Sequence, residues 1–224
     1  RNEDPVFRPE AGKRMQGSNP SAKNNTVEVP ALAEEELLRA NIYALLSALL
    51  ISPPDEHLLA VVKDLEGDDS AFGTALTELA EQARKIDQGD IIDEFTRLFY
   101  GHGAGGELHP YASYYLTGFI YEKPLADLRR DLGRLGRART DVTAEPEDHV
   151  AVLMNAIHDL ITGTHGDTES LDGQKDFFDK HIEPWAGRFF GDLEKAENAE
   201  FYRPVGTIGR LLMEIEDRAF TIAA

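Results

Sequence analysis

A chain of 224 residues is long enough for one sizeable hydrophobic core, and this length favours one domain with a terminal tail. It carries 41 acidic and 23 basic residues, a formal net charge of −18, which argues against binding to nucleic-acid phosphates. Cysteine is absent, which excludes disulfides, thiolate catalysis and cysteine-based metal sites. No apolar run is long enough to span a membrane and no export signal opens the sequence, so we expect a cytoplasmic protein.

The first part of the chain differs in composition from the rest. Residues 1–30 are rich in Asn, Pro, Gly, Ser and charged side chains, so they cannot bury enough apolar surface to offset the entropy of ordering. We interpret them as a disordered arm or as a segment partly foreign to the natural protein. Residues 31–224 are then one all-helical domain.

Helical periodicity dominates from Leu32 onward, with turn residues between successive apolar stripes. Ser70 and Asp90 are expected N-caps, and Pro124 and Pro146 are expected at the starts of helices. Strand signals are poor, so the sequence predicts an all-α helical bundle with short loops. The predicted stripes are Leu38, Ile42, Leu45 and Leu49; Phe72, Leu76, Leu79, Ala83 and Ile86; Ile91, Phe95, Leu98 and Phe99; Leu125, Leu128, Leu132 and Leu135; Val150, Leu153, Ile157, Leu160 and Ile161; and Ile208, Leu211, Leu212 and Ile215.

Enzyme signatures are weak. The glycine-rich segment 101–106 lacks both the Lys-Ser/Thr pair of a phosphate loop and a preceding strand, and is more typical of a flexible connection. His and carboxylate side chains between residues 102 and 149 could converge on a divalent metal, but none has the spacing that places two ligands on one helical face. These candidates are His102, His109, Glu147, Asp148 and His149. We therefore expect no cofactor and no catalytic residues.

Two short segments carry more specific information. Phe95-Thr96-Arg97-Leu98-Phe99 places three apolar side chains on one helical face, which is typical of a core but could also line an apolar trough for a peptide. Glu145-Pro146-Glu147-Asp148-His149 is either a well-formed helix start or an anionic site facing a groove, with Asp148 beside a titratable His149. The net acidity is likewise open to two interpretations, general solubility or attraction of a basic partner.

Together, in this order, the two segments resemble the motifs of the redox-enzyme maturation chaperones of the TorD/DmsD type. The resemblance spans roughly residues 35–218 and includes Pro110-Tyr111-Ala112-Ser113 and His181-Ile182-Glu183-Pro184-Trp185. It implies an all-helical cytoplasmic chaperone, not an enzyme. The binding residues it implies are Phe95, Leu98, Phe99, Pro146, Asp148 and His149.

The partner implied by the resemblance is the twin-arginine signal peptide, and the apo catalytic subunit, of a molybdenum-cofactor oxidoreductase of the dimethyl-sulfoxide-reductase superfamily. The chaperone would hold this client until its cofactor is inserted and only then allow export. Two alternatives remain. One is a small metal- or nucleotide-using enzyme centred on the His, Asp and Glu residues of 102–149, and the other is a helical scaffold with no signal-peptide role.

Overall fold

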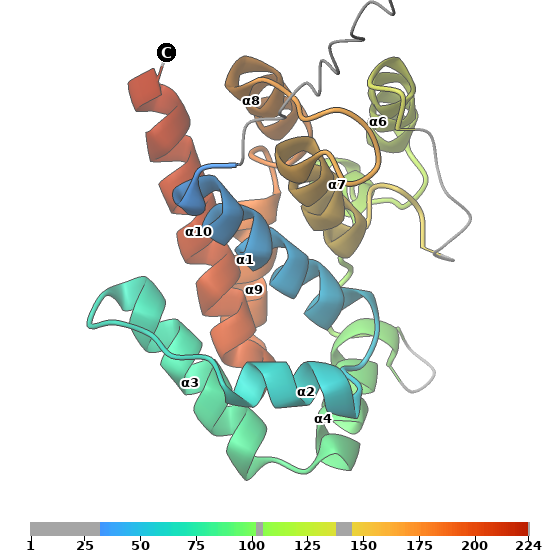
Figure 1. The fold of residues 1–224 in the computed structure, drawn as a ribbon. Helices are drawn as coiled ribbons and strands as arrows, with labels where there is room; N and C mark the ends of the chain where they lie inside the picture. The colour runs from blue at the N-terminus through green and yellow to red at the C-terminus, as the bar shows by residue number, and fades with distance from the viewer. Residues whose placement is uncertain (1–31, 102–104, 138–144, 224) are drawn as a thin grey trace, which may run out of the picture. The chain divides into compact units, whose positions relative to one another are not determined.

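The structure is a computed structural model that describes residues 32–101, 105–137 and 145–223. Helices account for most of this part of the chain and no β-strand forms in it (Figure 1). The predicted arm, residues 1–30, lies outside the described residues. The elements are α1 (Glu34–Ile51), α2 (Glu56–Lys63), α3 (Ala71–Lys85), α4 (Gln88–Phe95), the π-helical turn η1 (Thr96–Tyr100), α5 (Ala112–Thr117), α6 (Lys123–Arg134), α7 (Val150–Thr162), α8 (Leu171–His181), α9 (Ala186–Lys195) and α10 (Tyr202–Ala223).

Several helix ends follow from local sequence chemistry. The predicted N-cap Ser70 is confirmed, because its hydroxyl accepts a hydrogen bond from the Gly73 N–H at 3.0 Å. Pro124 lies in the first turn of α6, as predicted. The predicted cap at Asp90 is wrong: the N-cap position is Asp87, three residues earlier, α4 begins at Gln88, and Asp90 lies inside the first turn.

The start of α10 is capped from a distance by Glu94 on α4. This buried carboxylate accepts hydrogen bonds from the backbone N–H groups of Glu200, Phe201 and Tyr202 at 2.8–3.0 Å. A buried carboxylate that satisfies three otherwise unpaired N–H groups stabilises the helix start. Glu94 thus joins α4 to α10 across more than a hundred residues of sequence.

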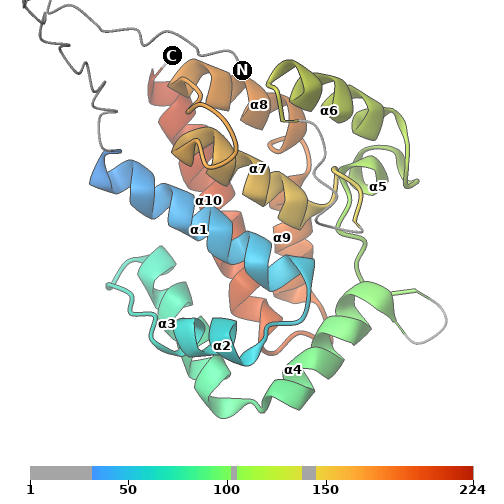
Figure 2. The same cartoon turned by 45° about the vertical axis from the view of Figure 1, so that its right-hand side comes forward.

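The core lies where α1 packs on α7 and where α10 packs on α9 and α3 (Figures 1 and 2). Its largest buried side chains are aromatic, and Trp185 satisfies its indole N–H by donating to the His181 carbonyl at 2.9 Å. The predicted stripe on α7 is confirmed, since all five of its members are buried. None of the described helices is long and apolar enough to cross a membrane.

Two predicted stripes are only partly correct. On α1, Leu49 is buried as predicted, but Leu38 is exposed and the buried face is centred on Tyr43, Leu46 and Leu50. On α10, Ile208 and Leu212 are buried as predicted, but Ile215 is exposed because the buried face continues from Leu212 through Glu216 and Phe220. From Ile42 to Ile51 every position of α1 except Ser47 is apolar, so periodicity in the sequence cannot decide which side faces the partner helix.

Candidate functional site

One connecting segment links the two motif segments predicted from the sequence. The Leu108 N–H donates to the Leu98 carbonyl at 2.8 Å, and the Pro110 carbonyl accepts from the Val150 N–H at 2.8 Å. Tyr111 and His149 then form an isolated antiparallel bridge. Residues 105–113 therefore run from η1 to the turn that precedes α7, and hold the two motifs in one region of the molecule.

The first motif covers the end of α4 and all but the last residue of η1. Leu98 is fully buried, which confirms the prediction that it belongs mainly to the core, and Phe95 is buried with it. Phe99 is half-buried, with its ring 4.9 Å from that of Phe95 and 5.7 Å from that of Tyr202. A π-helical turn is rare and frequently marks a functional site. In this chain η1 is followed by its C-cap residue Gly101, whose positive φ of 69° is a conformation that glycine tolerates best.

The second motif is not a helix start at Pro146, and that prediction is wrong. Pro146 lies in a turn in which its carbonyl accepts from the His149 N–H at 3.0 Å, and α7 begins only at Val150. His149 is the N-cap residue, because its Nδ1 accepts from the Ala151 N–H at 3.2 Å. Histidine can replace the usual Ser or Asp here because a neutral imidazole nitrogen is an acceptor.

Asp148 does not face an open groove, so that one of the two interpretations of the second motif is wrong for this side chain. Its side chain is buried, at 1 % exposed, and its Oδ2 accepts from the Ser113 N–H at 3.0 Å in the first turn of α5. Its carbonyl accepts from the Ala112 N–H at 2.9 Å. Asp148 therefore caps α5 from across the fold. Its Oδ1 and the Ser113 hydroxyl, both buried, have no hydrogen-bond partner among the residues that the structure describes.

His149 is buried beside Tyr111, whose ring lies 5.2 Å away edge-on. Burial lowers the pKa of His149 from 6.5 to about 4 and outweighs the opposite effect of Glu145. The imidazole is therefore neutral near pH 7, which suits its role as a hydrogen-bond acceptor at the start of α7. A charged His149 facing a ligand at neutral pH does not fit this environment.

Glu145 is the motif residue that the sequence interpretation missed. Its half-buried carboxylate accepts hydrogen bonds from two hydroxyls, that of Tyr111 at 2.8 Å and that of Tyr100 at 3.3 Å. Burial, and next the hydrogen bond to Glu145, raise the pKa of Tyr111 well above its ordinary value; Tyr100 and Tyr121 raise it further. We call Tyr100, Tyr111, Tyr121 and Glu145 the tyrosine–glutamate cluster. Tyr100 comes directly after the first motif, so this cluster connects the two motifs.

The tyrosine–glutamate cluster carries exposed aromatic residues. Tyr100 and Tyr121 of the cluster are 55 % and 68 % exposed, and Phe119, two residues before Tyr121, is also exposed. Tyr121 adopts a φ of 62°, which is uncommon for a residue with a side chain. An anionic group near exposed aromatic residues is suited to bind a guanidinium ion, through an ion pair and through cation–π contact.

The predicted metal candidates do not form a metal site within the described part of the chain, where no group of three or more His, Asp or Glu residues is placed to hold an ion. His102 lies outside the described residues. His109 packs its ring 4.4 Å from that of Tyr114, and Glu147 forms an ion pair with Arg129.

Among the hollows of the described surface, two border the elements that carry these residues. One, of about 650 Å³, lies among α3, α4, the π-turn and the start of α10. The other, of about 150 Å³, lies between α5, α6 and α8. The larger hollow is lined by Glu78, Glu81, Gln82, Glu94, Arg97, Glu197, Asn198, Ala199, Glu200, Arg203 and Pro204.

Comparison with known proteins decides the family. The profile of the family described as "Nitrate reductase delta subunit" matches residues 65–191, more than half of the chain. The chain belongs to this family. Its curated relatives are chaperones of the TorD type, which confirms the resemblance found in the motifs and identifies a chaperone rather than an enzyme.

Relatives and a solved structure agree with this assignment. The chaperone protein TorD of Vibrio parahaemolyticus is 24% identical over 202 residues, covering 81% of this chain and 92% of that protein. TorD of Aliivibrio salmonicida is 28% identical over 155 residues, covering 66% and 71%. A proposed redox enzyme maturation protein from Archaeoglobus fulgidus superposes with a TM-score of 0.53 at 25% identity, covering 79% of this chain and 94% of that chain. The predicted all-α fold is thereby confirmed.

Proposed function

We propose that this chain is a maturation chaperone for a molybdenum-cofactor oxidoreductase, and that it binds the twin-arginine signal peptide and the apo form of that client in the cytoplasm. It holds the client until the cofactor is inserted and then releases it for export. The family membership supports the chaperone role, and the names of the relatives support a redox enzyme as the client.

The observation that carries the signal-peptide step is the tyrosine–glutamate cluster. A twin-arginine peptide presents two guanidinium groups followed by an apolar run. The Glu145 carboxylate, held in position by two tyrosine hydroxyls and half-buried, offers a charge-assisted and partly desolvated partner for one guanidinium. The exposed rings of Tyr100, Phe119 and Tyr121 offer apolar surface for the segment that follows.

The six motif residues take different parts in this proposal. Phe95 and Leu98 are core residues that fix the π-turn, and Asp148 and His149 fix the starts of α5 and α7. They would act by positioning Tyr100, Tyr111 and Glu145. Phe99 and Pro146, both half-buried, are the two of the six motif residues that a peptide could touch without any displacement of Arg129.

Overall charge favours the same partner. A net charge of −18 attracts a basic peptide over a distance set by screening, about 8 Å at physiological ionic strength. Affinity for the twin-arginine peptide is therefore expected to fall as salt rises. An affinity that is flat from low salt to well above physiological salt would remove this contribution.

Calorimetric titration with a synthetic twin-arginine signal peptide, and with a copy that has two lysines instead, tests the proposal. Wild type should prefer the arginine peptide, because a guanidinium pairs with a carboxylate in a planar, two-point geometry. Glu145→Gln should weaken binding about tenfold or more, the loss of one charged hydrogen bond. Glu66→Gln, an exposed glutamate on another part of the surface, removes the same charge and should change little. Equal affinity for both peptides, or no binding by wild type, would overturn the proposal.

A further inference from the structure

We propose that Arg129 on α6 occupies a second guanidinium site of this chaperone, the carboxylate of Glu147, and that an arginine of the client peptide replaces it there. This inference rests on the proposed function, because the incoming group is one of the two arginines of the signal peptide. Glu145 would receive one guanidinium directly, and the other would reach Glu147 by displacing Arg129.

The geometry of the ion pair shows an exposed cation covering a buried anion. The Nε and Nη2 atoms of Arg129 both lie 2.8 Å from Oε2 of Glu147. Glu147 is 7 % exposed, whereas the side chain of Arg129 is 48 % exposed. A carboxylate that is this far from water requires a cation, but the cation that it has lies at the surface, where another of the same kind can reach it.

Asp148 gives a second, independent indication of a cation site. The hydrogen bond to Glu147, and next the charges of Glu147 and Asp148, raise the pKa of Arg129, so the guanidinium lies within electrostatic range of both carboxylates. Yet Oδ1 of Asp148 is buried and accepts no hydrogen bond from any described residue. Arg129 therefore neutralises Glu147 without satisfying Asp148, and a guanidinium that enters from a different direction could contact both.

The sequence of α6 has the same chemistry as the proposed ligand. Arg129 and Arg130 are consecutive arginines, and Leu132 follows on the buried face of the helix. The unliganded chain thus covers its acidic turn with one of its own two consecutive arginines. Because the native contact and the incoming contact are the same ion pair, exchanging one for the other changes little in overall energy.

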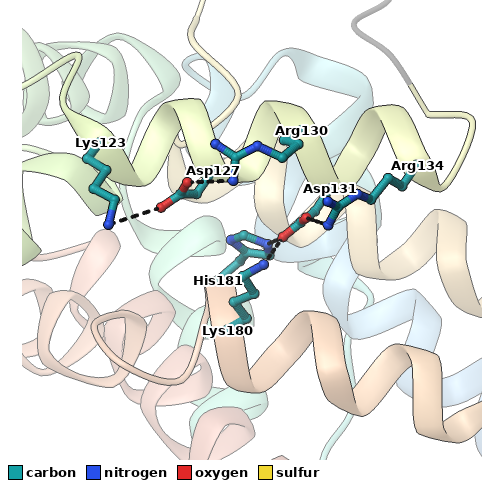
Figure 3. Close-up of polar contacts among 7 residues, drawn as sticks. All are labelled: Lys123, Asp127, Arg130, Asp131, Arg134, Lys180 and His181. Carbon is teal, nitrogen blue, oxygen red and sulfur yellow. Dashed lines mark hydrogen bonds and ion pairs between the residues drawn. The ribbon is translucent and has the colours of Figure 1, made fainter.

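Helix α6 has attachments that do not involve Arg129, as Figure 3 shows. Asp131 pairs with Lys180 and, at 3.0 Å, with the His181 Nε2 on α8, and the α6 leucines are buried. Arg130, in contrast, pairs with Asp127 on α6 itself at 2.9 Å. The release of Arg129 therefore leaves α6 in place. Arg130 is a matched control, because it is the same residue type on the same helix and its ion pair is with Asp127 rather than with Glu147.

The first test compares Arg129→Gln with Arg130→Gln in titrations with the twin-arginine peptide. Both variants lose one positive charge, so any general effect of net charge is equal in the two. Arg129→Gln should bind about tenfold more tightly than wild type, because the competing internal group is gone. Arg130→Gln should bind like wild type. Equal or weaker binding by Arg129→Gln relative to Arg130→Gln would overturn the exchange, even where wild type binds the peptide as proposed.

The second test needs no peptide. Arg129→Ala leaves a gap over Glu147, and methylguanidinium at about 10 mM should fill it and raise the melting temperature of this variant by a few degrees. Arg130→Ala and wild type should show no such increase. A selective increase would establish the guanidinium site even if no variant bound the twin-arginine peptide, an outcome that would overturn the proposed function alone. No selective increase would overturn the site.

Discussion

The two parts of this fold are stabilised by different kinds of contact. Where α1 meets α7 and α9 meets α10, the contact is made by buried aromatic and aliphatic side chains such as Trp185, Phe189 and Ile157. Around α5, α6 and the turn 145–149, much of the attachment is polar: ion pairs of Arg129 and Asp131, and hydrogen bonds to Glu145 and Asp148. Close packing makes the first part rigid, whereas polar contacts in the second can be exchanged for those of a ligand.

The apolar part should show the largest effect of a single substitution. Leu98→Ala should lower the free energy of unfolding by about 2–5 kcal/mol, because it opens a cavity beneath the π-turn. Leu116→Ala, at an exposed leucine on α5, is the control and should change stability little. Thermal and denaturant unfolding measure both. If Leu98→Ala melts like wild type, the assignment of the first motif to the core is wrong.

The buried His149 predicts a specific dependence of stability on pH. Its pKa is about 4 in the folded chain and near 6.5 when the chain is unfolded, so the unfolded state takes up the proton first as pH falls. Its stabilising contribution is present above pH 6.5 and is lost progressively towards pH 4, about 3 kcal/mol in total.

Denaturant unfolding at a series of pH values, for wild type and His149→Gln, measures this dependence. The glutamine side chain does not titrate, so the difference in unfolding free energy between the two proteins should change across this window, in favour of the variant at low pH. A constant difference from pH 7 to pH 4 would contradict a buried neutral imidazole.

Asp148 should have a smaller effect that distinguishes capping from ligand binding. Asp148→Ala leaves the buried Ser113 N–H without its acceptor, and should cost about 1–3 kcal/mol. Asp148→Asn keeps an oxygen in reach of that N–H and should cost less. Unfolding experiments on the pair measure the cap. Equal stability of both variants and wild type would show that the carboxylate is not a cap for α5.

The smallest effect is expected at the ion pairs between α6 and α8. Asp131→Asn weakens contacts with Lys180 and His181 that are partly open to solvent, so the loss of global stability should be below about 1 kcal/mol. Hydrogen exchange should nevertheless become faster for the α6 amides than for those of α7. Faster exchange in both helices alike would show that α6 does not open separately from the core.

The difference between the apolar and the polar part of the fold explains which features could be predicted from the sequence. Strongly apolar stripes such as that of α7 predict helices and burial, because few arrangements bury five such residues at once. The residues of the polar region depend on partners far away in sequence. Asp148 is buried because it caps α5, and Glu145 is oriented by Tyr100 and Tyr111, contacts that no local pattern encodes.

The error at Pro146 has a similar origin. A proline followed by acidic residues is typical of the first turn of a helix. Here residues 146–149 instead form a turn closed by the His149 N–H on the Pro146 carbonyl, and His149, bridged to Tyr111, is the N-cap residue of α7. The motifs thus indicated the correct region of the molecule. Which side chains in that region are accessible to a ligand could be determined only from the folded structure.

The most direct test of the central claim, that the polar region around Glu145 receives the signal peptide, is photo-crosslinking followed by mass spectrometry. A twin-arginine peptide with a photoreactive residue beside the arginine pair should crosslink to Tyr100, to residues 111–121 or to 145–149, and free twin-arginine peptide should compete. Crosslinks that instead fall on the acidic hollow lined by Glu78, Glu81 and Glu197, or that the peptide does not compete away, would contradict the account.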